Sequence, residues 1–331
     1  MRKLSLILLI LTVVFAAVSC GKSGTQSNRY RIAVIPKGTT HDFWKSIHAG
    51  AVKAAQELSA QGQPVEVIWK GPLREDDREQ QVGVVEGFIS QNINGIVLAP
   101  LDNRALVRPV EEAMSAGIPT VIIDSGLETD KIASFVATDN IKGGELAAEQ
   151  MGKLLGGKGK VLMLRTQEGS ASTLDREAGF LKKIKSDYPG IELISSDQYA
   201  GSTRDTAKRA SENLLNRYGD DLNGIFTSAE PTTAGMLLAL QDINKAGKVA
   251  FVGFDSNQTF IDAMRSKQLQ AIVVQNPFKM GYLGVKAIVD HLQGRPVEKR
   301  VDTGVSLITL ENLETPESQE LLHAPLDQYL K

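Results

Sequence analysis

The amino-acid sequence predicts an α/β protein made of two doubly wound parallel-sheet domains. Short runs of β-branched and apolar residues alternate with amphipathic helical segments along the chain from residue 30 onward. A strand that is apolar at every position is typical of a parallel sheet that helices cover on both faces. About ten such units are too many for one open sheet, and 331 residues exceed the size at which a single core stops growing. We therefore expect two domains.

In the first part of the chain, the apolar runs predict strands at 31–35, 65–69, 95–99, 120–123 and 132–136. The helices between them are expected at 43–58, 77–90 and 106–116. Pro100 ends the third strand, and Gly117 caps the third helix.

The same alternation restarts in the second part. Helices are expected at 141–155, 174–187, 206–217, 234–246, 260–266 and 280–293. The strands are expected at 161–164, 191–195, 225–227, 249–253 and 271–275. In such sheets, ligands bind at the carboxyl ends of the strands, so candidate site residues are sought there.

The N-terminus has the features of a bacterial export signal. Arg2 and Lys3 precede an apolar run at 4–18, which is short for a membrane span. The run ends in Ala17-Val18-Ser19-Cys20, which resembles a lipobox, so Cys20 is expected to carry a lipid. We expect a signal peptide at 1–19, a lipidated tether at 20–30 and an extracytoplasmic protein anchored to a bacterial membrane. The alternative is an uncleaved anchor helix.

Composition and motifs exclude several classes of function. The formal net charge is −2, and no basic run offers a surface for nucleic acid. A near match to a phosphate-binding loop at 152–158 is followed by Gly159 instead of Ser or Thr, and a helix precedes it. Cys20 is the only cysteine, and the four histidines show no i, i+4 pair. We therefore expect no metal, no cofactor, no catalytic group and no nucleic-acid partner.

A series of motifs follows one order along residues 30–310. The segments are Ile32-Ala33-Val34-Ile35 with Thr40-His41-Asp42-Phe43-Trp44, Gly117-Ile118-Pro119 running to Asp124, Ala137-Thr138-Asp139-Asn140 with Gly143-Gly144, Arg176-Glu177-Ala178-Gly179-Phe180, Val252-Gly253-Phe254-Asp255 and Val274-Gln275-Asn276-Pro277. Together they resemble the ribose-binding protein family of periplasmic solute-binding proteins.

The resemblance implies two Rossmann-like domains joined by a three-crossover hinge. The N-terminal domain would comprise 31–138 plus 276–302, and the C-terminal domain 139–275 plus 303–331. It further implies a monomer that binds a sugar or polyol between the domains and delivers it to an ABC permease, without catalysis.

The resemblance also implies a set of ligand-binding residues. One wall is expected to contain His41, Phe43, Trp44, Asp124 and Ser125, the other Arg176, Glu230 and Asp255, with Gln275 at the hinge and Tyr199 as an additional candidate. Aromatic rings can cover a sugar face, and carboxylates, guanidinium and amide groups can bond its hydroxyls. The structural alternatives are that Trp44 packs beneath its loop, that the aspartates cap helices and that Arg176 forms a surface ion pair.

Two departures from the family pattern affect the ligand. Ser125 stands where ribose binders have Arg, and Ala229-Glu230 where they have Asn-Asp. Ribose itself is therefore not expected, whereas another pentose, a hexose, a cyclitol or a sugar-like signal remains open. The alternative functions are a sensory lipoprotein that presents such a signal to a kinase or chemoreceptor and, more remotely, a repressor-like ligand domain. The latter would need a DNA-binding helix-turn-helix that is absent here.

Overall fold

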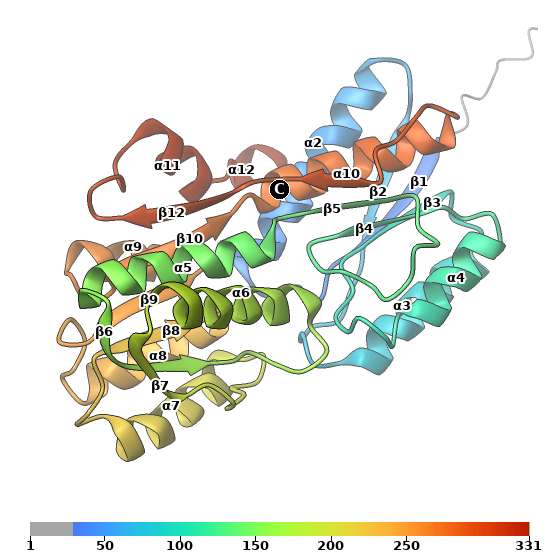
Figure 1. The fold of residues 1–331 in the computed structure, drawn as a ribbon. Helices are drawn as coiled ribbons and strands as arrows, with labels where there is room; N and C mark the ends of the chain where they lie inside the picture. The colour runs from blue at the N-terminus through green and yellow to red at the C-terminus, as the bar shows by residue number, and fades with distance from the viewer. Residues whose placement is uncertain (1–28, 331) are drawn as a thin grey trace, which may run out of the picture.

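Two six-stranded sheets, each covered by helices, form the protein in the computed structural model, which describes residues 29–330 (Figure 1). The expected signal peptide, Cys20 and nearly all of the expected tether lie outside the described residues. Among those described, no helix is long and apolar enough to cross a membrane.

The first sheet has the strand order β11-β5-β4-β3-β1-β2, and all its pairings are parallel. Its strands are β1 (Tyr30–Ile35), β2 (Val65–Trp69), β3 (Gly95–Leu98), β4 (Thr120–Ile123), β5 (Ser134–Ala137) and β11 (Arg300–Asp302). Helices α2 (Asp42–Ala60) and α10 (Pro277–Leu292) cover one face, and α3 (Arg78–Ser90) and α4 (Val107–Ser115) the other. An apolar core lies on each face of this sheet, and alternate residues of β1 pack into one core or the other, because successive side chains of a strand point to opposite faces.

The second sheet has the order β12-β10-β9-β8-β6-β7. Its strands are β6 (Lys158–Leu164), β7 (Gly190–Ser195), β8 (Gly224–Thr227), β9 (Ala250–Phe254), β10 (Ala271–Gln275) and β12 (Val305–Thr309). Helices α5 (Asn140–Leu155) and α6 (Ala171–Asp187) cover one face, and α7 (Arg204–Tyr218), α8 (Glu230–Asp242) and α9 (Gln258–Arg265) the other. We call the two sheets with their helices the first and second units.

The predicted class, two doubly wound α/β sheets, is confirmed with one exception. Strand β12 runs antiparallel to β10, so the second sheet is not wholly parallel. Helix α8 begins at Glu230 instead of 234, because Pro231 suits the first turn of a helix and the Thr232 hydroxyl accepts the Ala229 N–H. It ends at Asp242, four residues before the predicted end.

The chain passes between the two units after β5, after β10 and after β11. Two of these segments lie close together, since the hydroxyls of Thr138 and Thr303 are 3.5 Å apart. The last segment then packs on both units: α11 (Pro316–Leu322) contacts β10, and α12 (Leu326–Tyr329) contacts α2 (Figure 1).

Candidate functional site

Loops at the carboxyl ends of the two sheets face one another and enclose a cavity, which we call the central cavity. The first unit contributes loops after β1, β2 and β4, and the second unit loops after β6, β8 and β9. The lining residues are Lys37, His41, Phe43, Trp44, Glu75, Asp124, Thr166, Gln167, Ser170, Ser172, Thr173, Arg176, Ala229, Glu230, Pro231, Asp255 and Gln275. The cavity volume is about 40 Å³, which is room for about one water molecule.

One segment of the second unit, residues 167–172, holds the units together; we call it the latch. Its contacts to the first unit are Gln167 Nε2 to Glu75 O (3.1 Å), Arg78 Nη2 to Glu168 O (3.2 Å), Asn103 N to Gly169 O (2.8 Å), Lys37 Nζ to the hydroxyls of Ser170 (3.3 Å) and Ser172 (3.1 Å), and Ser172 N to Ser125 Oγ (3.0 Å). The structure is therefore the closed form.

Asp124 and Asp255 each follow a buried strand and each have a left-handed backbone, with φ of 62° and 67°. This conformation is uncommon for residues other than glycine, although Asp tolerates it better than most. Both side chains are buried and line the central cavity, and neither is the N-cap of the helix that follows it along the chain, although Asp255 Oδ2 accepts the N–H of Glu230, the first residue of α8. N-capping of the following helix is therefore wrong for both residues, while Asp255 does bond the N-terminus of α8.

Asp124 forms a buried ion pair with Lys37, a residue that the sequence analysis missed. Lys37 Nζ lies 2.8 Å from Asp124 Oδ2, and each side chain is 4% exposed. The contact is an ion pair without hydrogen-bond geometry, so this oxygen has a charged neighbour but no aligned hydrogen-bond donor. Lys37 instead donates to Ser170 and Ser172 across the cleft.

Asp255 is held by donors from its own unit. Its Oδ1 accepts from Gln275 Nε2 at 2.7 Å, and its Oδ2 accepts from Glu230 N at 3.1 Å. Burial raises the pKa of Asp255, and the nearby Arg176 charge only partly opposes this shift.

Arg176 is 2% exposed, so it is not a surface residue. Its Nε donates to Asn140 Oδ1 at 2.9 Å and its Nη1 to Ser228 O at 3.0 Å. Its guanidinium lies over the Phe254 ring, 4.0 Å from the centroid. The distance to Asp255 Oδ2 is 3.9 Å, so Arg176 depends on Asn140 and Ser228 more than on this carboxylate.

Glu75 connects two of the expected residues. Its Oε1 accepts from Trp44 Nε1 at 2.8 Å and lies 3.1 Å from His41 Nδ1. Burial opposes the charge of both groups. The hydrogen bond and the opposite charge of the partner nevertheless outweigh burial. The pKa of Glu75 is below its ordinary value, and the pKa of His41 is above its ordinary value. Trp44 is 2% exposed and packs in the first core, as its structural alternative predicts, while also bordering the cavity.

Three buried acceptor oxygens at the central cavity have no hydrogen-bond partner. They are Asp124 Oδ2, Glu230 Oε2 and Gln275 Oε1. The other oxygen of Glu230 accepts from Asn257 Nδ2 at 2.7 Å and from Arg204 Nη2. Buried polar atoms are normally bonded, so these three suit a molecule that donates hydrogen bonds.

Eight of the ten expected site residues line this cavity: His41, Phe43, Trp44, Asp124, Arg176, Glu230, Asp255 and Gln275. Ser125 does not line it, because its hydroxyl accepts the latch bond from Ser172. Tyr199 does not line it either. It bridges to Arg165, whose guanidinium lies 4.8 Å from the ring centroid, and borders a separate outer hollow.

The residues that the sequence analysis missed also follow strand ends. Lys37 follows β1, Glu75 follows β2, and the small polar run Ser170, Ser172 and Thr173 follows β6. Applying the strand-end rule to every strand would have identified them. Within residues 29–330, no group of three or more His, Cys, Asp or Glu side chains is arranged to hold a metal ion.

Comparison with known proteins places the chain among binding proteins. A family model described as a periplasmic binding protein domain matches residues 32–296. The ribose import binding protein of Bacillus subtilis is 30% identical over 268 residues, 81% of this chain and 83% of that protein.

Two solved structures have the same fold. An ABC transporter solute-binding protein from Agrobacterium vitis with bound D-fucose is 35% identical, with a TM-score of 0.83 over 88% of this chain and 100% of that one. A carbohydrate transporter solute-binding protein from Agrobacterium radiobacter in complex with D-arabinose is 31% identical, with a TM-score of 0.83 over 89% and 99% of the two chains.

Proposed function

The chain belongs to the periplasmic binding protein domain family, and from this premise we propose that it is an extracytoplasmic substrate-binding lipoprotein. It captures a neutral sugar or sugar-like polyol between its two units and delivers the ligand to an ABC importer. Its relatives include a ribose import binding protein and solute-binding proteins with bound D-fucose and D-arabinose.

The three unpartnered acceptor oxygens in the central cavity are the observation that carries this proposal. Hydroxyl groups donate hydrogen bonds, and a polyol offers several within one small molecule. An amino acid carboxylate or a phosphate would instead bring further acceptors. Leaving buried acceptors unpaired costs about 1–3 kcal/mol each, so a ligand without donors is disfavoured.

The charges around the cavity favour an uncharged ligand. Each carboxylate has a basic neighbour: the pairs are Asp124 with Lys37, Glu75 with His41, Glu230 with Arg204, and Asp255 with Arg176. A charged ligand would upset this balance in a site with little water to screen it. Phe43 offers an apolar ring at the same cavity, which suits the C–H face of a sugar.

We also propose the boundaries of the two domains. We assign 31–138 with 276–302 to one domain and 139–275 with 303–331 to the other. The two separate sheets and the three passages between them support this assignment.

A thermal-shift screen of the chain from residue 21 onward, against neutral monosaccharides and polyols, tests the binding function. A ligand at one hundred times its Kd adds about 2.7 kcal/mol to the free energy of unfolding. Calorimetry then measures Kd for each hit. If charged amino acids or phosphates raise the melting temperature and no neutral sugar or polyol does, the proposal is wrong.

Delivery to an importer needs a cellular test. Deleting the gene should abolish uptake of the identified ligand, labelled isotopically, and restoring it should recover uptake. Normal uptake in the deletion strain would contradict the transport role.

Lipid attachment is tested at Cys20. The wild-type protein should fractionate with membranes and have the intact mass of a lipidated chain, whereas Cys20→Ser should be released into the soluble fraction. An unmodified soluble wild-type protein from the native host would contradict the anchor.

A further inference from the structure

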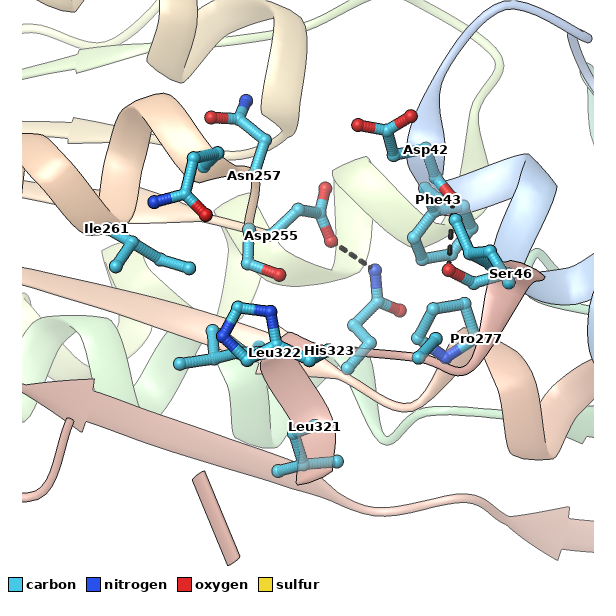
Figure 2. A pocket seen from close by; sticks show the side chains of 16 residues that line it. Asp42, Phe43, Ser46, Asp255, Asn257, Ile261, Pro277, Leu321, Leu322 and His323 are labelled. Carbon is cyan, nitrogen blue, oxygen red and sulfur yellow. Dashed lines mark hydrogen bonds between the residues drawn. The ribbon is translucent and has the colours of Figure 1, made fainter. Parts of the chain in front are cut away.

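A second cavity of about 240 Å³ adjoins the central cavity; we call it the side chamber. Its walls come from the start of α2, the β9–α9 loop, the passage between β10 and α10, and the C-terminal segment around α11. Figure 2 shows Phe43 and Ser46 facing Asp255 and Asn257 across the chamber, with Leu322 and His323 beside it. Both units therefore contribute to it.

The side chamber and the central cavity share three lining residues, Phe43, Asp255 and Gln275. Gln275 is 2% exposed, donates to Asp255 and leaves its Oε1 without a partner. These side chains therefore form the shared wall, and a ligand that reaches from the three unpartnered acceptors into the side chamber has to pass them.

The volumes of the two cavities differ sixfold, at about 40 and 240 Å³. At ~30 Å³ per water molecule, the side chamber has room for about eight waters, which is comparable to the space a sugar ring of about a dozen non-hydrogen atoms fills. In the closed form, most of the space near the candidate site is therefore in the side chamber.

The walls of the side chamber are amphipathic. Ile261, Pro277 and Leu322 provide apolar surface, while Ser46, Asn257 and His323 provide polar groups. This mixture suits a sugar ring, which has apolar C–H faces and a polar rim, better than an alkyl chain. The carboxylates of Asp42 and Asp255 disfavour an anion such as a phosphate.

We propose that the side chamber is a second sugar subsite, so that the ligand is a glycoside of two rings, one in the side chamber and one at the central cavity. Because the central cavity is only about 40 Å³ in this closed form, the two units must part slightly to admit the ring there. This inference rests on the proposed function and specifies its substrate class.

Calorimetry with paired probes tests the subsite. The chain from residue 21 onward is titrated with disaccharides and with the monosaccharides that compose them. We expect at least one disaccharide to bind about tenfold more tightly than its better monosaccharide component. If every disaccharide binds no more tightly than its components, the inference is overturned and the proposed function stands. If no sugar of either class binds, the proposed function fails and the inference fails with it.

Two variants fill the side chamber from different walls, Leu322→Trp from the C-terminal segment and Ser46→Gln from α2. Each should remove the roughly tenfold gain of the disaccharide and change the affinity for the monosaccharide less than about threefold. Leu310→Trp, at a position 46% exposed and outside the chamber, is the control and should change neither affinity. Unchanged disaccharide binding in both filling variants would overturn the subsite.

Discussion

Asp124 and Asp255 show how single residues shape the candidate site. Each ends an apolar strand, and each turns the chain through a left-handed conformation. Such a conformation carries a cost in a residue with a Cβ, and it persists only where the surrounding structure holds it. Here the bonds Asp124 N to Val136 O and Asp255 N to Val273 O hold both backbones to neighbouring strands. Both carboxylates consequently lie at the cavity.

Replacing Asp255 by Asn should weaken ligand binding by about 2–5 kcal/mol, as the loss of a buried charged partner does. Both carboxylate oxygens of Asp255 accept from donors, Gln275 Nε2 and Glu230 N. An amide has only one acceptor oxygen, so its NH₂ group would face a donor. Calorimetry with the ligand from the screen measures the change.

Asp262→Asn is the matched control, because Asp262 lies in the same unit with a side chain 62% exposed. It should leave the affinity unchanged. Equal affinities in both variants would mean that the central cavity does not bind the ligand.

The pair of His41 and Glu75 should make stability depend on pH. The pKa of His41 is above 6.5, because Glu75 and Glu230 more than offset the effect of burial and of Arg204. The contribution of His41 to the free energy of unfolding is therefore complete below pH 6.5 and is lost as pH rises through the raised pKa of the folded protein. The pKa of Glu75 is below 4.5. Its contribution to the free energy of unfolding is therefore complete above pH 4.5 and is lost as pH falls through the lowered pKa of the folded protein.

Urea unfolding of wild type and His41→Gln across this range measures the effect. The difference in free energy of unfolding should be largest between pH 4.5 and 6.5 and should shrink at higher pH. Glu75→Gln should show the same decline on the alkaline side, because it removes the same pair. A difference that is constant with pH would contradict this account.

At the scale of elements, glycines let paired helices approach closely in each unit. A Cβ on Gly144 of α5 would lie 1.9 Å from Arg176 O, and one on Gly179 of α6 would lie 2.2 Å from Ile141 O. Gly50 of α2 and Gly281 of α10 have the same reciprocal relation in the first unit. The close α5–α6 contact also sets the position of α6, the helix that carries Arg176.

Gly144→Ala should lower the free energy of unfolding by about 1–3 kcal/mol, because the added methyl group must push two backbones apart. Thermal unfolding monitored by circular dichroism measures this loss. Gly87→Ala is the control, since a Cβ on this helical glycine of α3 would meet nothing within 4 Å. It should be neutral or stabilising by roughly 0.5–1 kcal/mol. Equal melting temperatures for Gly144→Ala and wild type would refute the close-packing argument.

The elements that sequence reasoning predicted share strong apolar periodicity. The strands at 65–69, 120–123 and 271–275 have the predicted bounds, and most other elements differ by a few residues. β11 is missed because its side chains are exposed or partly exposed at the edge of the sheet, so its sequence Arg300-Val301-Asp302 has no apolar run. β12 was also not predicted. It breaks the expected parallel order because strand direction depends on how the chain returns from the first unit, which local patterns do not record.

The candidate site was predictable wherever a polar residue directly follows a buried strand, as with Asp124 and Asp255. The partners of Lys37, unlike Lys37 itself, show the limit of this reasoning. Its partners Ser170 and Ser172 are 133 and 135 residues away in sequence and belong to the other unit. Such a contact exists only once the two units close, so no local pattern can predict it.

At the scale of the whole molecule, closure depends on contacts that do not involve a ligand. The latch makes its bonds to the first unit with protein groups alone, and it includes backbone atoms of Glu168 and Gly169. The latch therefore favours the closed form independently of a ligand. A titration measures an apparent Kd, which equals the Kd of the closed form divided by the fraction of ligand-free protein that is closed. A protein that is more often closed without ligand therefore has a higher apparent affinity.

Arg78→Ala should shift the ligand-free protein toward the open form. It removes the bond from Arg78 to Glu168 O, which crosses the cleft, and the pairing of Arg78 with Asp102. One hydrogen bond contributes about 0.5–1.5 kcal/mol, so the closed-to-open ratio should fall roughly two- to tenfold. The apparent Kd should rise by the same factor if the closed form is the minor species, and by less if it is the major one.

Small-angle X-ray scattering of Arg78→Ala should show a larger radius of gyration than wild type without ligand, and the wild-type value at saturation. Arg104→Ala is the control, since this exposed arginine pairs with Glu128 within the first unit. Identical scattering and affinity for the two variants would mean that the latch does not set the position of the closure equilibrium.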